Sequence, residues 1–357
     1  MEPPQTPMEP QTPESPADAR SQRGRRPQTT MNDLAVAAGV SLKTVSRVIN
    51  GEPGVTAATL SKVEAAIEAL GYERNDLAAS LRSGVGSNTI GLVIEDVANP
   101  FYARVAQAVE DIAREHSSLL ITTSAREDPA RERELVTALL RRRVDALLIV
   151  PAGPDHRYIA RAGFVGHTVF LDRPPAKTDA DTVLVDNAAG AQIAVAHLLR
   201  QGHQRVAIVG DSGGLYTAGE RLDGYTHAFE RAGLTPQPEL ISMGHSTWES
   251  AHAAVLQLLD LPPGQRPTAI FAANNRCTVG AMHALHDGEQ DVALVGFDEF
   301  ELADLLGVTV VRTDPYRIGQ VAAQLAFSRI DGDERPPQRI TLPVDLIARG
   351  SGEIELG

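Results

Sequence analysis

Residues 30–50 read TMNDLAVAAGVSLKTVSRVIN, and this stretch predicts two short helices joined by a sharp turn at Gly39. Thr30 and Ser41 precede the two helices, where a hydroxyl group can satisfy free backbone N–H groups. At 100° per residue, apolar side chains fall on one arc of the second helix and polar side chains fall on the other. The apolar arc comprises Val45, Val48 and Ile49, and the polar arc comprises Lys43, Ser46, Arg47 and Asn50. These polar groups match base edges and phosphates of a DNA major groove, with a plain helical hairpin as the alternative.

A third amphipathic helix is predicted within residues 55–72, with Thr56 as its cap and Gly71 as its C-terminal stop. Its apolar stripe comprises Val63, Ile67 and Leu70. The next segment, NDLAASLRSG over residues 75–84, predicts a very short helix. Such a helix is marginal alone in water, so we expect it to form only when another surface packs on it.

From residue 89 onward, short apolar runs alternate with helical periods. Strands are expected over residues 89–96, 118–124, 145–151, 167–173, 205–211, 268–274 and 292–298, and helices over 101–116, 130–143, 185–202, 219–232 and 249–260. This alternation predicts mainly parallel sheets, covered on both faces, in two similar halves with a cleft between them. The expected fold is a small all-α helix-turn-helix head joined by a hinge helix to a two-lobed α/β core with parallel sheets. The expected divisions are a disordered tail (1–29), the head (30–74), a hinge helix and linker (75–88), and the core (89–351).

The sign of the charge changes along the chain. The formal charge is −13, yet residues 20–85 hold nine Lys and Arg against six Asp and Glu, whereas residues 86–357 hold 24 against 36. A locally basic head on an acidic body concentrates the attraction to DNA at one end of the protein.

Several classes of protein are disfavoured by the sequence. Cys277 is the only cysteine, which excludes an intramolecular disulfide and a cysteine-based metal cluster. No signal-peptide core and no run of 18 apolar residues occur, so we expect a cytoplasmic protein without membrane contact. No P-loop or G-x-S-x-G elbow occurs, and no spacing supports a glycosidase pair from Asp172, Asp298 and Glu299. We therefore expect no enzyme, cofactor or metal.

Polar residues stand at the carboxyl end of nearly every predicted strand. They are Asp96, Asp172–Arg173, Asp211–Ser212, Asn274–Asn275 and Asp298. Ligands of open α/β sheets bind beyond these ends, so the recurrence predicts a polar cleft, although Asp and Asn also cap helices in any α/β protein. Arg221 stands at the predicted start of a helix, where a cation opposes the macrodipole, which favours an anionic or polyol ligand. The alternative is a structural pair of Arg221 with Glu220 or Asp223.

Taken together, these stretches resemble the LacI/GalR family of bacterial transcription regulators over about residues 30–351. The specific matches are VAAGVSLKTVSRVING (36–51), ASL (79–81), NPFYARV (99–105), RRRVDALLIVP (141–151), FLDRPP (170–175), RLDGY (221–225), FAANN (271–275), ALVGFDE (293–299) and RGS (349–351). The resemblance implies that Leu42, Lys43 and Arg47 read bases. It also implies that Leu81 wedges into the minor groove at the operator centre.

The residues expected at DNA are Ser41, Leu42, Lys43, Thr44, Ser46, Arg47, Asn50, Leu81 and Arg82. Two positions depart from the family, which usually has Pro at Arg74 and Arg at Ala79. We expect Arg82 to replace the polar contact that is lost at Ala79.

The resemblance also implies that Arg221 grips the effector, that Asp298 accepts hydrogen bonds from it, and that Phe101 and Tyr102 pack on a sugar face or a base. Asn275 replaces an Asp that is common in the family. The residues expected at the effector are Phe101, Tyr102, Asp172, Arg173, Arg221, Asn274, Asn275 and Asp298.

We therefore predict a homodimeric repressor whose two heads read double-stranded, pseudo-palindromic operator DNA and whose affinity is switched by a small-molecule effector. A sugar is the first expectation for the effector, and a nucleoside or purine is the second. A sugar-binding protein without a regulatory role is the alternative class. No leucine heptads follow residue 351, which disfavours a tetramer built through a C-terminal coiled coil.

Overall fold

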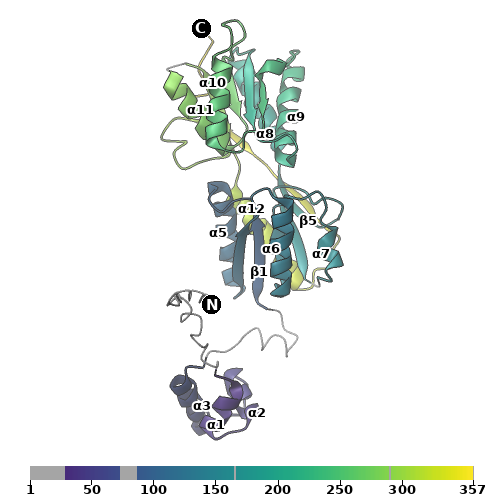
Figure 1. Ribbon diagram of the computed structural model, residues 1–357, viewed down its shortest axis with the longest axis vertical. Coiled ribbons are helices and arrows are strands. Elements are labelled where there is room, and N and C mark those ends of the chain that lie inside the picture. The colour runs from purple at the N-terminus through teal and green to yellow at the C-terminus, as the bar shows by residue number, and fades with distance from the viewer. Residues whose placement is uncertain (1–28, 73–86, 165, 289–290, 357) are drawn as a thin grey trace, which may run out of the picture. The chain divides into compact units, whose positions relative to one another are not determined.

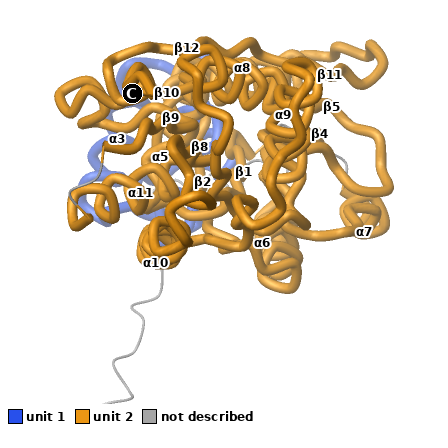
Figure 2. Tube along the Cα trace, turned by 90° about the horizontal axis from the view of Figure 1, so that it is seen from above, with its two compact units in different colours: residues 1–84 blue, residues 85–357 orange. Residues whose placement is uncertain are grey.

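The computed structural model describes residues 29–72, 87–164, 166–288 and 291–356. The expected tail up to residue 28 and the expected hinge helix, with Leu81 and Arg82, lie outside the described residues. The chain divides into two compact units, residues 1–84 and 85–357, which Figure 2 colours separately. Among the described helices, none combines the length and the apolar character that a membrane crossing requires.

The described part of the first unit contains three helices, α1 (Met31–Ala38), α2 (Leu42–Ile49) and α3 (Ala57–Leu70). Their caps follow the sequence: the hydroxyls of Thr30, Ser41 and Thr56 each accept a backbone N–H, and Gly39 and Gly71 end α1 and α3 in the left-handed conformation. The core that the three helices share is formed by Leu34, Ala38, Val45, Val63 and Ala66.

One residue of the predicted stripe of α3 does not reach this core. Leu70 is 40% exposed, while Val63 and Ala66 are buried and Ile67 packs against the core. The prediction for Leu70 was wrong because α3 ends at this residue, with the left-handed cap at Gly71, beyond the buried turns of the helix.

The second unit contains two six-stranded sheets, each in a lobe of its own (Figure 1). In the first lobe the strand order is β11-β5-β4-β3-β1-β2, and in the second lobe it is β12-β10-β9-β8-β6-β7. The first sheet comprises β1 (Thr89–Ile94), β2 (Leu119–Ser124), β3 (Ala146–Ile149), β4 (His167–Leu171), β5 (Asp181–Val185) and β11 (Arg339–Leu342). The second comprises β6 (Val206–Gly210), β7 (Ile241–Met243), β8 (Ala269–Ala272), β9 (Ala293–Phe297), β10 (Thr309–Arg312) and β12 (Asp345–Ile347). All pairings are parallel except that of β10 with β12.

Helices cover both faces of each sheet, as the buried strands require. In the first lobe α5 (Pro100–Glu115) and α12 (Pro315–Ile330) pack together on one face, and α6 (Pro129–Arg141) and α7 (Arg157–Arg161) lie on the other. In the second lobe α8 (Asn187–Arg200) pairs with α9 (Tyr216–Arg231), and α10 (Trp248–Leu259) pairs with α11 (Asn275–Gly288). A short 3-10 turn, Pro238–Leu240, precedes β7.

The two lobes are not consecutive halves of the sequence. After β10 the chain returns to the first lobe to form α12 and β11, and it then re-enters the second lobe with β12. In Figure 1, α12 accordingly lies beside α5, which comes from a distant part of the chain, and it packs on β3, β4 and β5. The sequence analysis expected no helix here, although α12 carries a polar side at helical spacing, formed by Arg317, Gln320, Gln324 and Ser328, opposite its buried side.

Close packing of α12 on α5 depends on Gly319. A Cβ added there would lie 2.3 Å from the carbonyl oxygen of Val105 and 3.0 Å from Ala108 Cβ, so the helices would have to separate. We expect Gly319→Ala to lower the free energy of unfolding by about 1–3 kcal/mol, the usual cost of overpacking a core. Urea denaturation followed by circular dichroism measures this loss. Gly264→Ala is the control, because nothing lies within 4 Å of its added Cβ, and equal stability of both variants would contradict the packing argument.

Candidate functional site

The carboxyl ends of the strands of both lobes meet at one cavity. All eight residues expected at the effector line it: Phe101, Tyr102, Asp172, Arg173, Arg221, Asn274, Asn275 and Asp298. The other polar lining residues are Glu95, Asn99, Glu127, Asp211, Thr217 and Arg276, of which the sequence had placed only Asp211 in the polar cleft, as a strand-end group. We call this cavity the cleft.

Asp172 and Asp298 occupy equivalent places in the two lobes. Asp172 directly follows β4 and Asp298 directly follows β9, and each of these strands is the third in the spatial strand order of its sheet. Both residues have a positive φ, 66° for Asp172 and 69° for Asp298. A non-glycine residue in this region is uncommon, although Asp tolerates it better than most, and such conformations concentrate at binding sites. The backbone turn therefore directs one buried carboxylate from each lobe into the cleft.

The first lobe surrounds Asp172 with polar partners. Tyr102 donates its hydroxyl to Asp172 Oδ2 at 3.0 Å. The neighbouring Arg173 donates from Nη1 and Nη2 to the two carboxylate oxygens of Glu127, both at 2.6 Å. Arg173 Nε is buried without a hydrogen-bond partner among the described residues, and it lies 3.5 Å from Asp172 Oδ2.

In the second lobe, Arg221 is held rigidly beside Asp298. Its Nε donates to Asn187 Oδ1 (2.8 Å), its Nη1 donates to the carbonyl of Ala273 (2.6 Å), and its guanidinium lies 3.8 Å from the ring centroid of Phe297. Its Nη2 is 3.6 Å from Asp298 Oδ2. Burial raises the pKa of Asp298, and the Arg221 charge and the Thr313 hydroxyl oppose this rise.

The sequence argument about the helix start at Arg221 was wrong. Helix α9 begins at Tyr216, so Arg221 lies in the second turn, beyond the reach of the terminal dipole. The start was misplaced because Leu215, at the N-cap position, makes no side-chain cap that a pattern could reveal. The charge of Arg221 is instead met by Asp298, and the expectation of an anionic or polyol ligand loses this support.

Two cleft residues belong to the start of α11. Asn274 Oδ1 accepts the backbone N–H of Cys277 at 2.7 Å, which is the capping role that Asn has in any α/β protein. Asn275 Nδ2 donates to Asn99 Oδ1 at 2.8 Å, and Asn99 caps α5 of the first lobe. The amide at position 275 therefore forms a direct bond between the lobes.

Arg276 forms a second connection between the lobes. Its guanidinium donates to Glu95 Oε1 at 3.0 Å and to Asp96 Oδ2 at 3.1 Å, both just after β1. Burial raises the pKa of Glu95, and Arg276 opposes the rise. Sequence reasoning noticed Asp96 as a strand-end group but had no signal for its partner, since Arg276 is 180 residues away.

The cleft is narrow and acidic. Its volume is about 60 Å³, and it is lined by five carboxylates and three guanidinium groups. Pockets that hold small ligands usually measure about 300–1,000 Å³, so the cleft is smaller in this structure than a usual ligand pocket.

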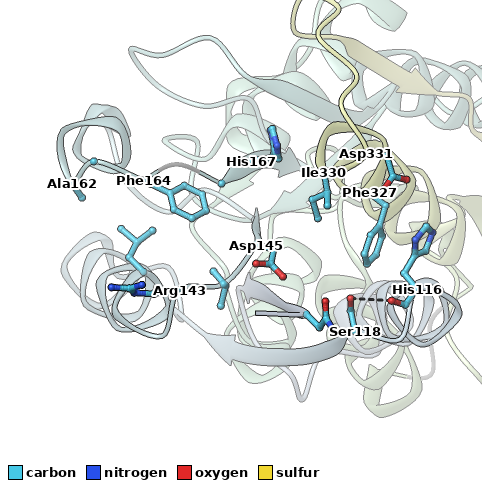
Figure 3. Close-up of a pocket in the computed structure, with 15 residues that line it drawn as sticks. His116, Ser118, Arg143, Asp145, Ala162, Phe164, His167, Phe327, Ile330 and Asp331 are labelled. Atoms are coloured by element: carbon cyan, nitrogen blue, oxygen red, sulfur yellow. Dashed lines mark hydrogen bonds between the residues drawn. The ribbon is translucent and has the colours of Figure 1, made fainter. Parts of the chain in front are cut away.

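A wider cavity of about 850 Å³ lies at the amino ends of the strands of the first sheet, whereas the cleft lies at their carboxyl ends (Figure 3). Its lining includes Asn88, Ser118, Asp145 and His167, which stand at the starts of β1 to β4. His116 stacks on Phe327 at 3.9 Å beside it. None of the residues expected at the effector lines this cavity.

The described residues do not favour covalent or metal chemistry at the cleft. Burial raises the pKa of the Cys277 thiol to about 12, which leaves it a poor nucleophile. Within the described ranges, no three His, Cys, Asp or Glu side chains are grouped so as to hold a metal ion. Trp248 is exposed at the start of α10 and packs on His283.

In the first unit, α2 presents its polar side to solvent. Leu42, Lys43 and Asn50 are exposed, and Thr44, Ser46 and Arg47 are half-buried. Ser41 is occupied as the N-cap of α2 and bonds Thr44. Arg47 and Asn50 are less free than the sequence suggested, because Arg47 donates to the carbonyl of Pro53 and Glu52 lies beside both side chains.

Comparison with known proteins decides the family. Residues 30–75 match the model for bacterial regulatory proteins of the lacI family, and residues 195–352 match a periplasmic binding protein-like domain. The ribose operon repressor of Escherichia coli (strain K12) is 33% identical over 331 residues, which are 90% of this chain and 99% of that protein. The chain belongs to the lacI family. It is therefore a DNA-binding transcription repressor that responds to a ligand.

Other similar proteins agree with this assignment of the lacI-family chain. The transcriptional repressor CytR of Escherichia coli (strain K12) is 28% identical over 329 residues, covering 90% of this chain and 96% of that protein. The crystal structure of the Lac repressor dimer bound to operator and the anti-inducer ONPF matches with a TM-score of 0.79 and 27% identity, covering 91% of this chain and 99% of that one. The complex of the regulator CelR with cellobiose matches with a TM-score of 0.68 and 30% identity, covering 91% of this chain and 100% of that one. These relatives are transcription regulators rather than enzymes.

Proposed function

We propose that this regulator binds an uncharged sugar, with a pentose such as ribose as the first candidate, in the cleft between its lobes. The observation that carries the proposal is a pair of Asp–Arg sets facing the cleft, Asp172 with Arg173 and Asp298 with Arg221. Their closest atoms are 3.5 and 3.6 Å apart, too far for a hydrogen bond, so each set offers an acceptor and a donor to a hydroxyl group. Vicinal hydroxyls of a sugar match this arrangement.

The aromatic corner of the cleft fits the same ligand class. Phe101 and Tyr102 are buried and meet edge to face, with ring centroids 5.1 Å apart. Such rings pack on the apolar face of a sugar, and equally on a nucleobase. The ribose moiety of a nucleoside would satisfy the two Asp–Arg sets as well, so a nucleoside is the second candidate.

An anionic ligand is disfavoured by the charge of the cleft. Two of the three lining arginines, Arg173 and Arg276, are already hydrogen-bonded to carboxylates, and the lining holds more carboxylates than guanidinium groups. We expect D-ribose to stabilise the protein against heat and ribose 5-phosphate to have no effect at equal concentration. At 100 times its Kd, a ligand adds about 2.7 kcal/mol of stability. A thermal-shift titration with D-ribose, cytidine, D-glucose and ribose 5-phosphate tests this, and stabilisation by the phosphate alone would overturn the proposal.

For the DNA-binding unit, we propose that α2 enters the DNA major groove. In this arrangement, base edges and phosphates would be contacted by Leu42, Lys43, Thr44, Ser46, Arg47 and Asn50. Ser41, the N-cap of α2, would lie near a phosphate. A cytoplasmic homodimer that reads a pseudo-palindromic operator follows from this role, with residues 30–74 as the DNA-binding head and 89–351 as the ligand-binding core. Gel retardation on DNA selected from a random pool tests it, because a sugar-binding protein without a regulatory role would select no sequence.

A further inference from the structure

Arg276 links the lobes through two carboxylates at once. Its Nη1 and Nη2 reach Glu95 and Asp96 of the first lobe, and Nη1 also donates to the carbonyl of Ser246 in its own lobe at 3.3 Å. The side chains of Arg276, Glu95 and Asp96 are 29%, 11% and 23% exposed. Partly buried pairs of this kind are screened by salt much less than surface pairs.

Carboxylates lie on both sides of this guanidinium. Burial works against the charge of Arg276, but Glu95, Asp96 and Asp211 together hold its pKa above its ordinary value. Asp211 follows β6 and belongs to the second lobe. Without the guanidinium, these three carboxylates would lose a cation that interacts with each of them, and like charges repel one another.

We propose that Arg276 is a positioning residue that gates the cleft. Its ion pairs with Glu95 and Asp96 hold the lobes together, and these pairs must break each time a ligand enters or leaves. The proposal rests on the cleft being the ligand site. Because the closed cleft encloses only about 60 Å³, the lobes have to open for any ligand, whichever groups that ligand uses for binding.

The ligand-free protein provides the first test. In Arg276→Gln, amide hydrogen exchange in peptides covering residues 95–103 and 273–280 should become faster by roughly tenfold, within the range usual for coupled conformational equilibria. Exchange in β3 and β8, at the centres of the two sheets, should stay unchanged. Arg157→Gln is the matched control, because it breaks an ion pair with Asp155 that lies within one lobe.

The second test follows D-ribose by stopped-flow measurement of its association and dissociation rates. If Arg276 gates the cleft, both rates should rise in Arg276→Gln. The equilibrium affinity, which is the ratio of the two rate constants, should then change less than either rate. The double variant Glu95→Gln, Asp96→Asn should raise both rates as well, and adding Arg276→Gln to it should have little further effect. Arg276→Lys, which keeps the charge, should restore part of the slow exchange and serves if the glutamine variant does not fold.

Three outcomes separate the explanations. Unchanged amide exchange and unchanged rates in Arg276→Gln would refute the gate. A faster dissociation of D-ribose without any change in exchange would make Arg276 a direct ligand contact and also overturn the proposal. Failure of D-ribose to bind the wild-type protein would sink the proposed ligand class, while the exchange experiment would still decide whether Arg276 holds the lobes together.

Discussion

Arg221→Ala is expected to abolish the response of DNA binding to D-ribose. The guanidinium is buried and fixed by Asn187, the Ala273 carbonyl and the Phe297 ring, so its direction into the cleft does not depend on the ligand. Hydrogen bonds to charged groups contribute about 1.5–3 kcal/mol, which corresponds to a loss of affinity of roughly 10- to 150-fold. Calorimetry with D-ribose measures the affinity, and fluorescence anisotropy on the selected DNA site, with and without D-ribose, measures the response.

Asp298→Asn is the companion to this variant. It keeps the size of the side chain and removes the carboxylate that lies opposite Arg221, so we expect a similar loss of D-ribose affinity. DNA binding without ligand should stay close to that of the wild type in both variants, because Arg221 and Asp298 belong to the second unit, whereas α2 belongs to the first. Ligand affinity that is unchanged in both variants would place the binding site elsewhere, and loss of DNA binding in both would make the two residues structural.

Arg47→Ala is expected to weaken binding to the specific DNA site by about 1–3 kcal/mol, the value of a good contact to a base edge. In the structure the guanidinium is held by the Pro53 carbonyl and lies 3.7 Å from Glu52, so we expect it to leave these partners to reach a base. Anisotropy titrations at one fixed salt concentration, on the selected site and on a scrambled site, measure the difference.

Glu52→Gln is the matched control for Arg47. It removes the carboxylate beside the guanidinium and leaves the Pro53 carbonyl in place, so binding to the specific site should be retained or become tighter. Equal affinity of Arg47→Ala and the wild type for the specific site would reject α2 as the recognition helix. A loss that is equal on specific and scrambled DNA would assign Arg47 to phosphate contact instead of base reading.

The sequence could predict those features that depend on near neighbours. Thr30 and Ser41 mark the starts of α1 and α2, and Gly39 marks the end of α1, because capping is a contact between residues a few positions apart. The buried strands β1, β3 and β4 appear as apolar runs, and Asp172 and Arg173, which follow β4, line the cleft. Where such a signal was lacking, as at Leu215, the start of the helix was misplaced.

Only the tertiary structure decided how distant segments meet. The return of α12 and β11 to the first lobe, the Glu127 carboxylate on Arg173, and the pairing of Arg276 with Glu95 and Asp96 join residues that are 46 to 205 positions apart or more. Periodicity and capping report which side of an element is buried, but they carry no information on which other element buries it. The sequence by itself therefore determined the elements, their caps and the chemistry at the strand ends. The fold alone determined which of those groups face one another across the cleft, because that choice depends on the packing of surfaces brought together from far along the chain.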